Sequence, residues 1–162
     1  MMDDKILIAF FSHSGNTRKI ANLIQEATGG ALHEIRPKVP YPNAYHAVVD
    51  QAKREIRAGY QPPLESSLDA IEPYEIILVG TPNWWRTLAP PVRTFLTQHD
   101  LSGKAIAPFC THGGGGMDKI IRDIAKLCPE STLLAGLKIY GSDGGSAQAE
   151  VFAWLEELGI TS

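Results

Sequence analysis

The segment ILIAFFSHSGNTR, residues 6–18, passes from an unbroken apolar run into a short loop of hydroxyl, glycine and amide residues. The apolar run predicts a strand that is buried on both faces, as in a parallel sheet. A helical pattern follows the loop, because Ile20, Ile24 and Ala27 recur at the spacing of one helix face. Strand, polar loop and helix start together predict an anion site, since the first N–H groups of a helix lack partners and its dipole is positive there.

The loop offers only neutral donors to such an anion. Hydroxyl, glycine and asparagine residues are concentrated in Ser12, Ser14, Gly15, Asn16 and Thr17. An ordinary turn between a strand and a helix needs one hydroxyl cap, so this concentration favours a phosphate site. The motif GxxxxGK[ST] is absent, GxGxxG does not follow the strand, and the loop has no cysteine nucleophile. A single terminal phosphate that is bound and left intact therefore fits best.

The composition predicts one domain over residues 1–162, which is long enough for a sizeable core. A net charge of -3 suggests neither a nucleic-acid groove nor binding to an anionic membrane. The N-terminus does not resemble a signal peptide and no apolar run is as long as a membrane span, so we expect a cytoplasmic protein. Cys110 and Cys128 are expected to be free thiols. The five His and two Cys show no ligand spacing, which predicts no metal site.

Strand-like and helical patterns alternate along the chain, which predicts an α/β architecture with a parallel sheet. The expected strands cover residues 6–11, 31–36, 75–80, 104–110 and 137–140. The first two expected helices end at the glycines of positions 29 and 59, and the later ones cover 90–99, 117–128 and 147–158. Asn43 is the expected N-cap of the second helix.

Two further loops should lie beside residues 12–17, because ligands of open parallel sheets bind outside the carboxyl ends of the strands. The loop after the third strand reads TPNWWRT, residues 81–87, and at least one of its two tryptophans should form an exposed aromatic platform. The loop after the fourth strand contains four consecutive glycines, residues 113–116. They permit main-chain amides to approach a ligand closely, although a flexible hinge or lid is the alternative. Phosphate donors, an aromatic platform and amides together fit FMN.

At these loops the chain resembles the flavodoxin-like family, and the resemblance covers essentially its full length. Residues 11–17 are similar to the family's phosphate loop, [ST]-x-[ST]-G-x-T, and residues 79–85 and 108–114 resemble its two ring-binding loops. The pattern PYP at residues 40–42, with Glu55, resembles a branch of short-chain flavodoxin-type proteins. The resemblance implies a three-layer sandwich with a five-stranded parallel sheet of order 2-1-3-4-5.

The resemblance also implies which residues bind FMN. The phosphate loop would contribute Ser12, His13, Ser14, Gly15, Asn16 and Thr17. One side of the flavin ring would face Pro82, Asn83, Trp84 and Trp85. The other side would face Thr111, His112, Gly113, Gly114 and Gly115. No catalytic acid or base is assigned, and Asp143, after the fifth strand, is either a neighbour of the site or a plain turn residue.

Two functions follow from an FMN site of this kind. The first is electron transfer through a non-covalently bound flavin, with a redox partner protein or a small electron acceptor. The alternative is an NAD(P)H-dependent FMN oxidoreductase that acts on a quinone or a similar small acceptor. A receiver domain without cofactor is disfavoured, because the third strand ends in VGT, residues 79–81, and not in Asp. We expect a monomer or a homodimer that binds neither nucleic acid nor membranes.

Overall fold

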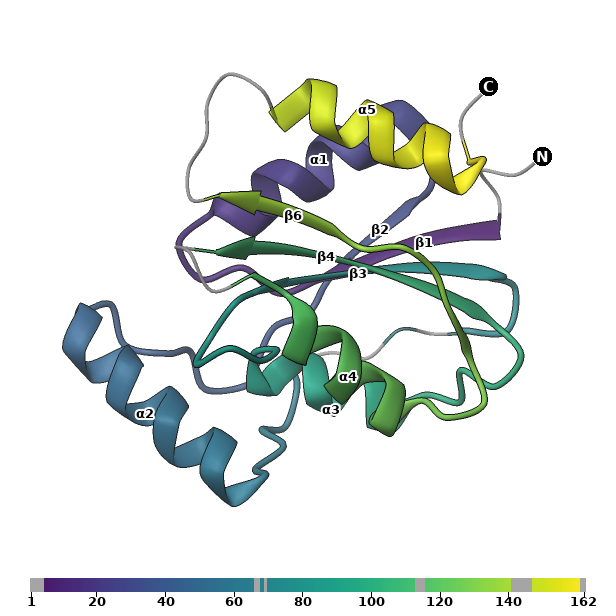
Figure 1. The fold of residues 1–162 in the computed structure, drawn as a ribbon. Coiled ribbons are helices and arrows are strands. Elements are labelled where there is room, and N and C mark those ends of the chain that lie inside the picture. Colours follow the sequence, from purple (N-terminus) through teal and green to yellow (C-terminus); the bar gives the residue numbers. More distant parts are fainter. Residues whose placement is uncertain (1–4, 66–67, 69, 113–115, 141–146, 161–162) are drawn as a thin grey trace.

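A parallel sheet forms the middle layer of the structure, and helices cover both of its faces (Figure 1). This computed structural model describes residues 5–65, 68, 70–112, 116–140 and 147–160. The strands are β1 (Ile6–Phe10), β2 (Ala31–Glu34), β3 (Ile76–Pro82), β4 (Ala105–His112), β5 (Thr132–Leu133) and β6 (Leu137–Tyr140). They pair in the order β2-β1-β3-β4-β5, with β6 also next to β4, and every pairing is parallel. The predicted α/β fold with strand order 2-1-3-4-5 is confirmed.

The fifth position of the sheet is shared by β5 and β6, where the sequence predicted one strand. β5 pairs with Ala105 and Ile106, and β6 pairs further along β4, from Phe109 to His112. Between them the chain leaves the ladder, and the carbonyl of Ala135 accepts a hydrogen bond of 2.8 Å from the Trp154 indole. Sequence analysis missed β5 because two residues are too few to show a strand pattern.

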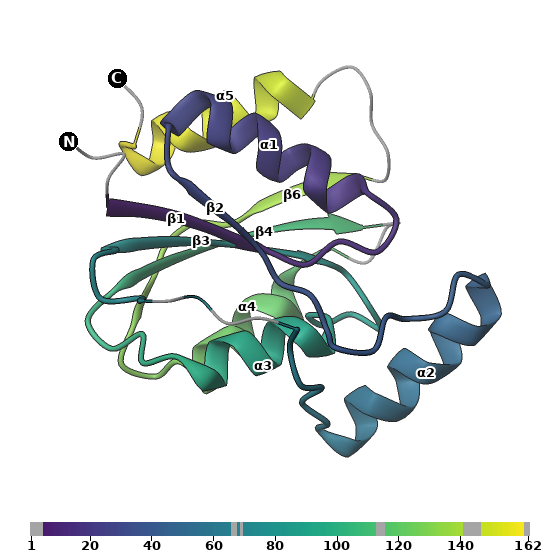
Figure 2. The ribbon, with the colours of Figure 1, turned by 180° about the vertical axis from the view of Figure 1, so that it is seen from behind.

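The helices lie on both faces of the sheet, except for α2, which projects beyond it (Figures 1 and 2). On one face lie α1 (Asn16–Thr28) and α5 (Ala147–Leu158), and on the other lie α3 (Pro90–Gln98) and α4 (Asp118–Leu127). The projecting helix α2 (Tyr45–Ala58) buries Val48 and Ala52. Among the described residues, no helix combines the length and the apolarity that crossing a membrane requires.

The start of α2 differs from the sequence prediction. Ala44, with extended backbone angles, occupies the capping position, and its side chain makes no cap. The prediction that Asn43 caps this helix was therefore wrong. The helix begins one residue later than predicted, and its first main-chain hydrogen bond runs from the Val48 N–H to the Ala44 carbonyl, at 3.1 Å.

The strands also end at other residues than predicted. β2 ends at Glu34 and not at Arg36, because the chain leaves the ladder after one further bond, from the Ile35 N–H to the Phe10 carbonyl, at 2.6 Å. β3 and β4 each begin one residue later than predicted and end two residues later, at Pro82 and His112. The first residues of both expected ring-binding loops therefore have the fixed backbone of a strand.

Strand β1 is buried on both faces, as its unbroken apolar run predicts. Its alternate side chains enter two separate clusters. Leu7 and Ala9 pack with residues of α3 and α4, while Ile8 and Phe10 pack with residues of α1 and α5. Each large apolar side chain buried in this way stabilises the fold by about 1.5–3 kcal/mol. The loop after β1 therefore starts from one of the most firmly held segments of the sheet.

We expect Gly80→Ala to destabilise the fold, because an added Cβ would lie 2.3 Å from Cζ of Phe109 and 2.9 Å from Cβ of Phe10. Overpacking of this kind costs about 1–3 kcal/mol. The free energy of unfolding, measured in denaturant, should fall by that amount. Shortening the obstructing ring with Phe109→Leu should make the double variant less destabilised than the sum of the two single ones. If the losses of the two single variants simply add in the double variant, the close approach of Phe109 to Gly80 is contradicted.

We also expect acid to weaken the fold through His33 and His99, whose imidazoles flank Phe95 at 5.7 Å and 4.6 Å between ring centres. Burial lowers the pKa of both rings, and the charge of His99 lowers that of His33 further. The unfolded chain then binds more protons than the folded one, so stability falls as the pH drops below the ordinary histidine value of about 6.5. In denaturation at a series of pH values, His33→Gln should flatten this decline. His46→Gln, on the exposed side of α2, should leave it unchanged.

Candidate functional site

The loop between β1 and α1 leaves the start of α1 without a cap. Gly15 holds the capping position in the left-handed region, at φ 98°, and its N–H donates to Oγ of Ser12 at 3.1 Å. Within the described residues, no side chain accepts a hydrogen bond from the main-chain N–H groups of Asn16, Thr17 or Arg18, and the first turn of α1 holds no acidic residue. These N–H groups and the helix dipole therefore remain available to an anion from outside the chain.

The predicted donor Thr17 has a protein partner. Its side chain is buried, and its hydroxyl lies 2.9 Å from the hydroxyl of Thr111, at the end of β4. This contact joins the loop after β1 to the strand that precedes the third predicted loop. Any bond from Thr17 to a phosphate would have to compete with this contact.

Residues 84–87 form a tight hairpin after β3. The N–H groups of Trp84 and Thr87 each donate to the other residue's carbonyl, both at 3.0 Å. Between them, Trp85 and Arg86 adopt left-handed angles, with φ of 54° and 69°. This geometry corresponds to the two-residue turn that usually carries Asn-Gly or Gly-Gly, and it costs a residue with a side chain about 1–2 kcal/mol. Strain of this size persists only where the surroundings hold the turn in place.

The side chain of Asn83 holds this hairpin to the loop after β4. Its Oδ1 accepts from the Arg86 N–H at 2.9 Å, and its Nδ2 donates to the carbonyl of Gly116. The main chain adds a bond of 2.8 Å from the Asn83 N–H to the Thr111 carbonyl. Asn83 thus connects the two loops that were predicted to flank a ring.

Helix α4 holds the other end of the hairpin. The hydroxyl of Thr87 donates to the carboxylate of Asp123, which also pairs with Lys119 at 2.9 Å. Burial alone would raise the pKa of Asp123, but the hydrogen bonds from Thr87 and Lys119 hold it below its usual value. The carboxylate therefore stays ionised as an acceptor for Thr87.

The two tryptophans of the hairpin have different surroundings. The indole of Trp84 is half-buried and packs edge-on against Tyr41 and Phe11, with ring centres 5.0 Å and 5.4 Å away. Trp85 is 47% exposed, and its Nε1 donates to the Val49 carbonyl of α2 at 3.0 Å. The expectation that at least one of the two lies at the surface is confirmed.

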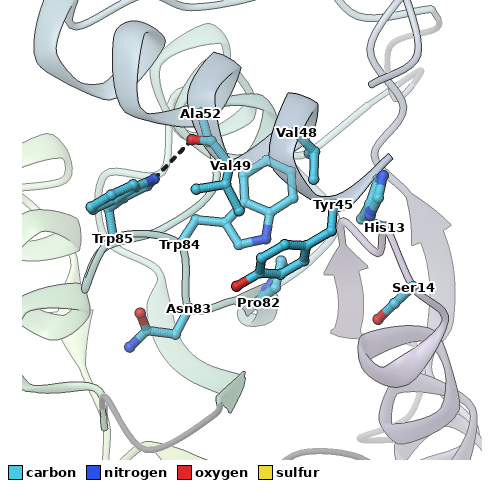
Figure 3. Close-up of a pocket in the computed structure, with 10 residues that line it drawn as sticks. All are labelled: His13, Ser14, Tyr45, Val48, Val49, Ala52, Pro82, Asn83, Trp84 and Trp85. Carbon is cyan, nitrogen blue, oxygen red and sulfur yellow. Dashed lines mark hydrogen bonds between the residues drawn. The ribbon is translucent and has the colours of Figure 1, made fainter. Parts of the chain in front are cut away.

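A pocket of about 490 Å³ lies between α2 and the carboxyl ends of β1 and β3. Figure 3 shows the rings of Tyr45 and Trp84 together in its middle, between Trp85 and His13. The lining residues are His13, Ser14, Tyr45, Val48, Val49, Ala52, Pro82, Asn83, Trp84 and Trp85. Most of these lining side chains are apolar or aromatic, as in most sites for small molecules.

Sequence analysis predicted only part of this lining. His13, Ser14 and residues 82–85 were assigned to the site, and the structure brings them to one pocket. The contribution of α2 was missed, although its lining residues have the spacing i, i+3, i+4 and i+7 from Tyr45. Such spacing is also typical of the core-facing side of a helix, and the structure shows that on α2 it lines a pocket.

Two of the predicted site residues, His13 and His112, have contacts outside this lining. His13 also contacts the Pro42 carbonyl through Nε2, at 3.0 Å. The imidazole of His112 packs edge-on against Tyr140, with ring centres 5.6 Å apart, at the ends of β4 and β6. The predicted residues Gly113, Gly114 and Gly115, and also Asp143, lie outside the described residues.

Two arginines near the phosphate loop share one carboxylate. Arg18 and Arg36 both pair with Glu34, at 2.5 Å and 3.0 Å, in a hollow of about 410 Å³ on the far side of Ser12 and His13. Burial would raise the pKa of Glu34, but hydrogen bonds from both arginines lower it below its usual value. The carboxylate stays ionised, so it compensates one of the two guanidinium charges.

The described residues offer neither a reactive thiol nor a metal centre near the pocket. Cys110 is buried, and burial raises its pKa to about 12, so its thiol stays protonated. No three His, Cys, Asp or Glu side chains of the described chain gather in a way that could hold a metal ion. The chemistry of this site must therefore come from a bound group or from the side chains that surround the pocket.

Comparison with known proteins gives a family match over nearly the whole chain. The model of the family described as Flavodoxin matches residues 5–158. The chain is similar to a putative flavoprotein of Bacteroides eggerthii, with 27% identity and a TM-score of 0.85 over 97% of this chain and 99% of that one. One from Bacteroides uniformis has 28% identity and a TM-score of 0.84 over 94% and 97%. A flavoprotein of Lactobacillus acidophilus, solved in complex with FMN, shares the fold at 24% identity and a TM-score of 0.74 over 93% and 98%.

We expect Asn83→Ala to loosen the hairpin, because it leaves the Arg86 N–H and the Gly116 carbonyl without their partner. The Gly116 carbonyl is partly buried, and losing its partner costs about 1–3 kcal/mol, whereas the exposed Arg86 N–H can bond to water. Unfolding in denaturant should show a loss in that range, and the fluorescence of the hairpin tryptophans should change in the native state. Asn43→Ala is the control, because Asn43 is exposed and should leave both readings near those of the unmodified protein. Equal behaviour of the two variants would contradict the bridging role.

Proposed function

The chain belongs to the flavodoxin family, and on that premise we propose that it binds FMN non-covalently and transfers electrons through the flavin. The observation that carries this proposal is the uncapped start of α1, which opens beside an aromatic pocket. A mononucleotide that joins one phosphate to a flat ring system matches both features. The flavin, once bound, supplies the ability to take up and release electrons.

The phosphate end of FMN fits the donors of the loop after β1. The main-chain N–H groups at the start of α1 and the hydroxyl of Ser14 are neutral donors, and the helix dipole favours a dianion by about 0.3–1 kcal/mol per contact. A Cβ added to Gly15 would meet no atom within 4 Å, so the space above this residue is open for a ligand. In this role the loop binds and orients the cofactor without reacting with its phosphate.

The ring end fits the opposite side of the pocket. Pro82 and Trp84 present a flat apolar surface, and Asn83 fixes that surface relative to the end of β4. The imidazole of His13 packs edge-on against Trp84, with ring centres 5.9 Å apart, at the corner where phosphate loop and ring wall meet. The FMN in the Lactobacillus acidophilus flavoprotein supports the same cofactor here.

The phosphate assignment is tested with a pair of glycine variants. Gly15 and Gly103 both adopt left-handed angles, at φ 98° and 78°, and both have open space at the Cβ position. Gly15→Ala and Gly103→Ala therefore carry similar backbone strain, but only the first changes the proposed phosphate loop. We expect Gly15→Ala to weaken FMN binding about tenfold or more, the equivalent of one lost bond to a charged group.

Titration of each apoprotein with FMN, followed by quenching of the flavin fluorescence, measures the dissociation constants. Gly103→Ala should keep that of the unmodified protein. If neither variant differs from it, the phosphate does not lie at Gly15. If the unmodified protein binds no FMN, the proposed function itself fails.

The source of the electrons is tested anaerobically with the protein loaded with FMN. For a carrier, addition of NADPH or NADH should leave the flavin absorption band unchanged, and light or a separate reductase should bleach it. Rapid bleaching by the nucleotide alone would instead establish the alternative, an NAD(P)H-dependent FMN oxidoreductase. The apolar pocket beside the proposed ring site is the feature that favours a small acceptor, because a carrier for protein partners needs only an exposed ring edge.

A further inference from the structure

We propose that the face of α2 formed by Tyr45, Val48, Val49 and Ala52 is the wall of an acceptor subsite for a neutral, flat, two-electron acceptor of the quinone class. The proposal rests on the proposed function, because the acceptor takes its electrons from the bound flavin. The acceptor would be a second ligand beside the flavin, and α2, which lies outside the loops assigned to the flavin, would bind it. These four residues are called the α2 wall below.

The α2 wall faces the pocket because α2 is not packed onto the sheet. Figures 1 and 2 show this helix projecting beyond the sheet, next to α3. Tyr45 is 74% exposed, although its ring lies on the pocket beside Trp84 (Figure 3). An exposed aromatic side chain over an apolar pocket is typical of a ligand surface rather than of a core.

Three contacts hold the α2 wall at a fixed place. The Trp85 indole donates to the Val49 carbonyl, and the ammonium of Lys53 lies 5.2 Å from the centre of the same indole ring. Behind the wall, the hydroxyl of Tyr41 donates to the Glu55 carboxylate at 2.6 Å. The pocket is therefore a preformed space and not a gap that opens beside a loose helix.

The charge of the pocket selects a neutral ligand. Among the described residues, ten line the pocket, and none of them is Asp, Glu, Lys or Arg; their titratable side chains are those of His13 and Tyr45. A nicotinamide dinucleotide brings a charged pyrophosphate, which would find no cation on this lining. A flat neutral ring gains from stacking on Tyr45 and from burial against Val49, which is only partly buried in the protein itself.

The position of the subsite allows direct electron transfer. The α2 wall lines the same pocket as Pro82 and Trp84, which the proposed function assigns to the flavin ring. An acceptor on this wall therefore lies beside the flavin. Its two carbonyl oxygens gain two electrons and two protons and become the hydroxyls of a hydroquinone, while the reduced flavin loses the same two electrons and two protons.

The first test is binding without turnover. Menadione is titrated into the oxidised protein loaded with FMN, which has no electrons to give, and the heat of binding is recorded. We expect saturable binding, a dissociation constant about tenfold higher for Tyr45→Ala, and a value close to the original for Tyr45→Phe, which keeps the ring. Asp50→Ala, on the exposed side of the same helix, is the control and should bind menadione unchanged.

The second test compares two acceptors after the bound flavin is reduced by light. Reoxidation by menadione should saturate with its concentration and slow in Tyr45→Ala and in Val49→Asp, which places a charge on the wall. Reoxidation by ferricyanide, a small anion that needs no apolar subsite, should not change. A fall in both rates would indicate damage to the flavin site and would overturn the proposal.

The dissociation constant for FMN, measured for each variant, separates this proposal from the proposed function. If Tyr45→Ala weakens FMN binding but not menadione binding, the α2 wall belongs to the flavin and the acceptor subsite is wrong. If FMN binds normally in every protein and menadione never saturates, the function stands and this proposal fails. If the unmodified protein binds no FMN, the function fails first.

Discussion

The parallel register of β1, β3 and β4 is the constraint on which the site depends. Phe10, Gly80 and Phe109 lie in one row across these strands, and β1 ends at this row while β3 and β4 end two and three residues beyond it. The row is possible because the middle residue has no side chain and leaves room for the ring of Phe109. The loops that follow therefore meet at one edge of the sheet, where α1 presents its free N–H groups.

The sequence was sufficient to predict the features that depend on local pattern. An apolar run such as residues 6–10 is buried on both faces in any parallel sheet, and loops after such strands must meet at one edge. The sequence did not predict the orientation of α2, because the same apolar spacing occurs in a helix that packs on a core and in a helix that lines a pocket. The sequence also did not predict the left-handed turn at Trp85 and Arg86, because such turns usually carry glycine or asparagine.

The hydroxyl residues of the phosphate loop have partners that residue type alone does not predict. Ser12, Ser14 and Thr17 are alike in sequence, yet each has different surroundings in the fold. The Ser12 hydroxyl accepts a hydrogen bond from the Gly15 N–H, and Thr17 is buried against Thr111. Ser14 lines the pocket. A hydrogen bond is worth only about 0.5–1.5 kcal/mol net, so a ligand gains most from donors that have no partner to lose. By this argument the helix amides and Ser14 matter more to an anion than Thr17 does.

The hairpin couples the two walls of the pocket. Trp84 packs into the aromatic cluster with Phe11 and Tyr41, while the next residue, Trp85, is bonded to the main chain of α2. The turn at Trp85 and Arg86 is strained, so it keeps its shape only while Asn83, Thr87 and α2 hold it. A movement of α2 would release Trp85 and allow the turn to relax, which would displace Trp84 as well. The wall assigned to the flavin and the wall formed by α2 are therefore coupled through this hairpin, in which the Trp85 indole bonds to α2 while Asn83 and Thr87 bond to the loop after β4 and to α4.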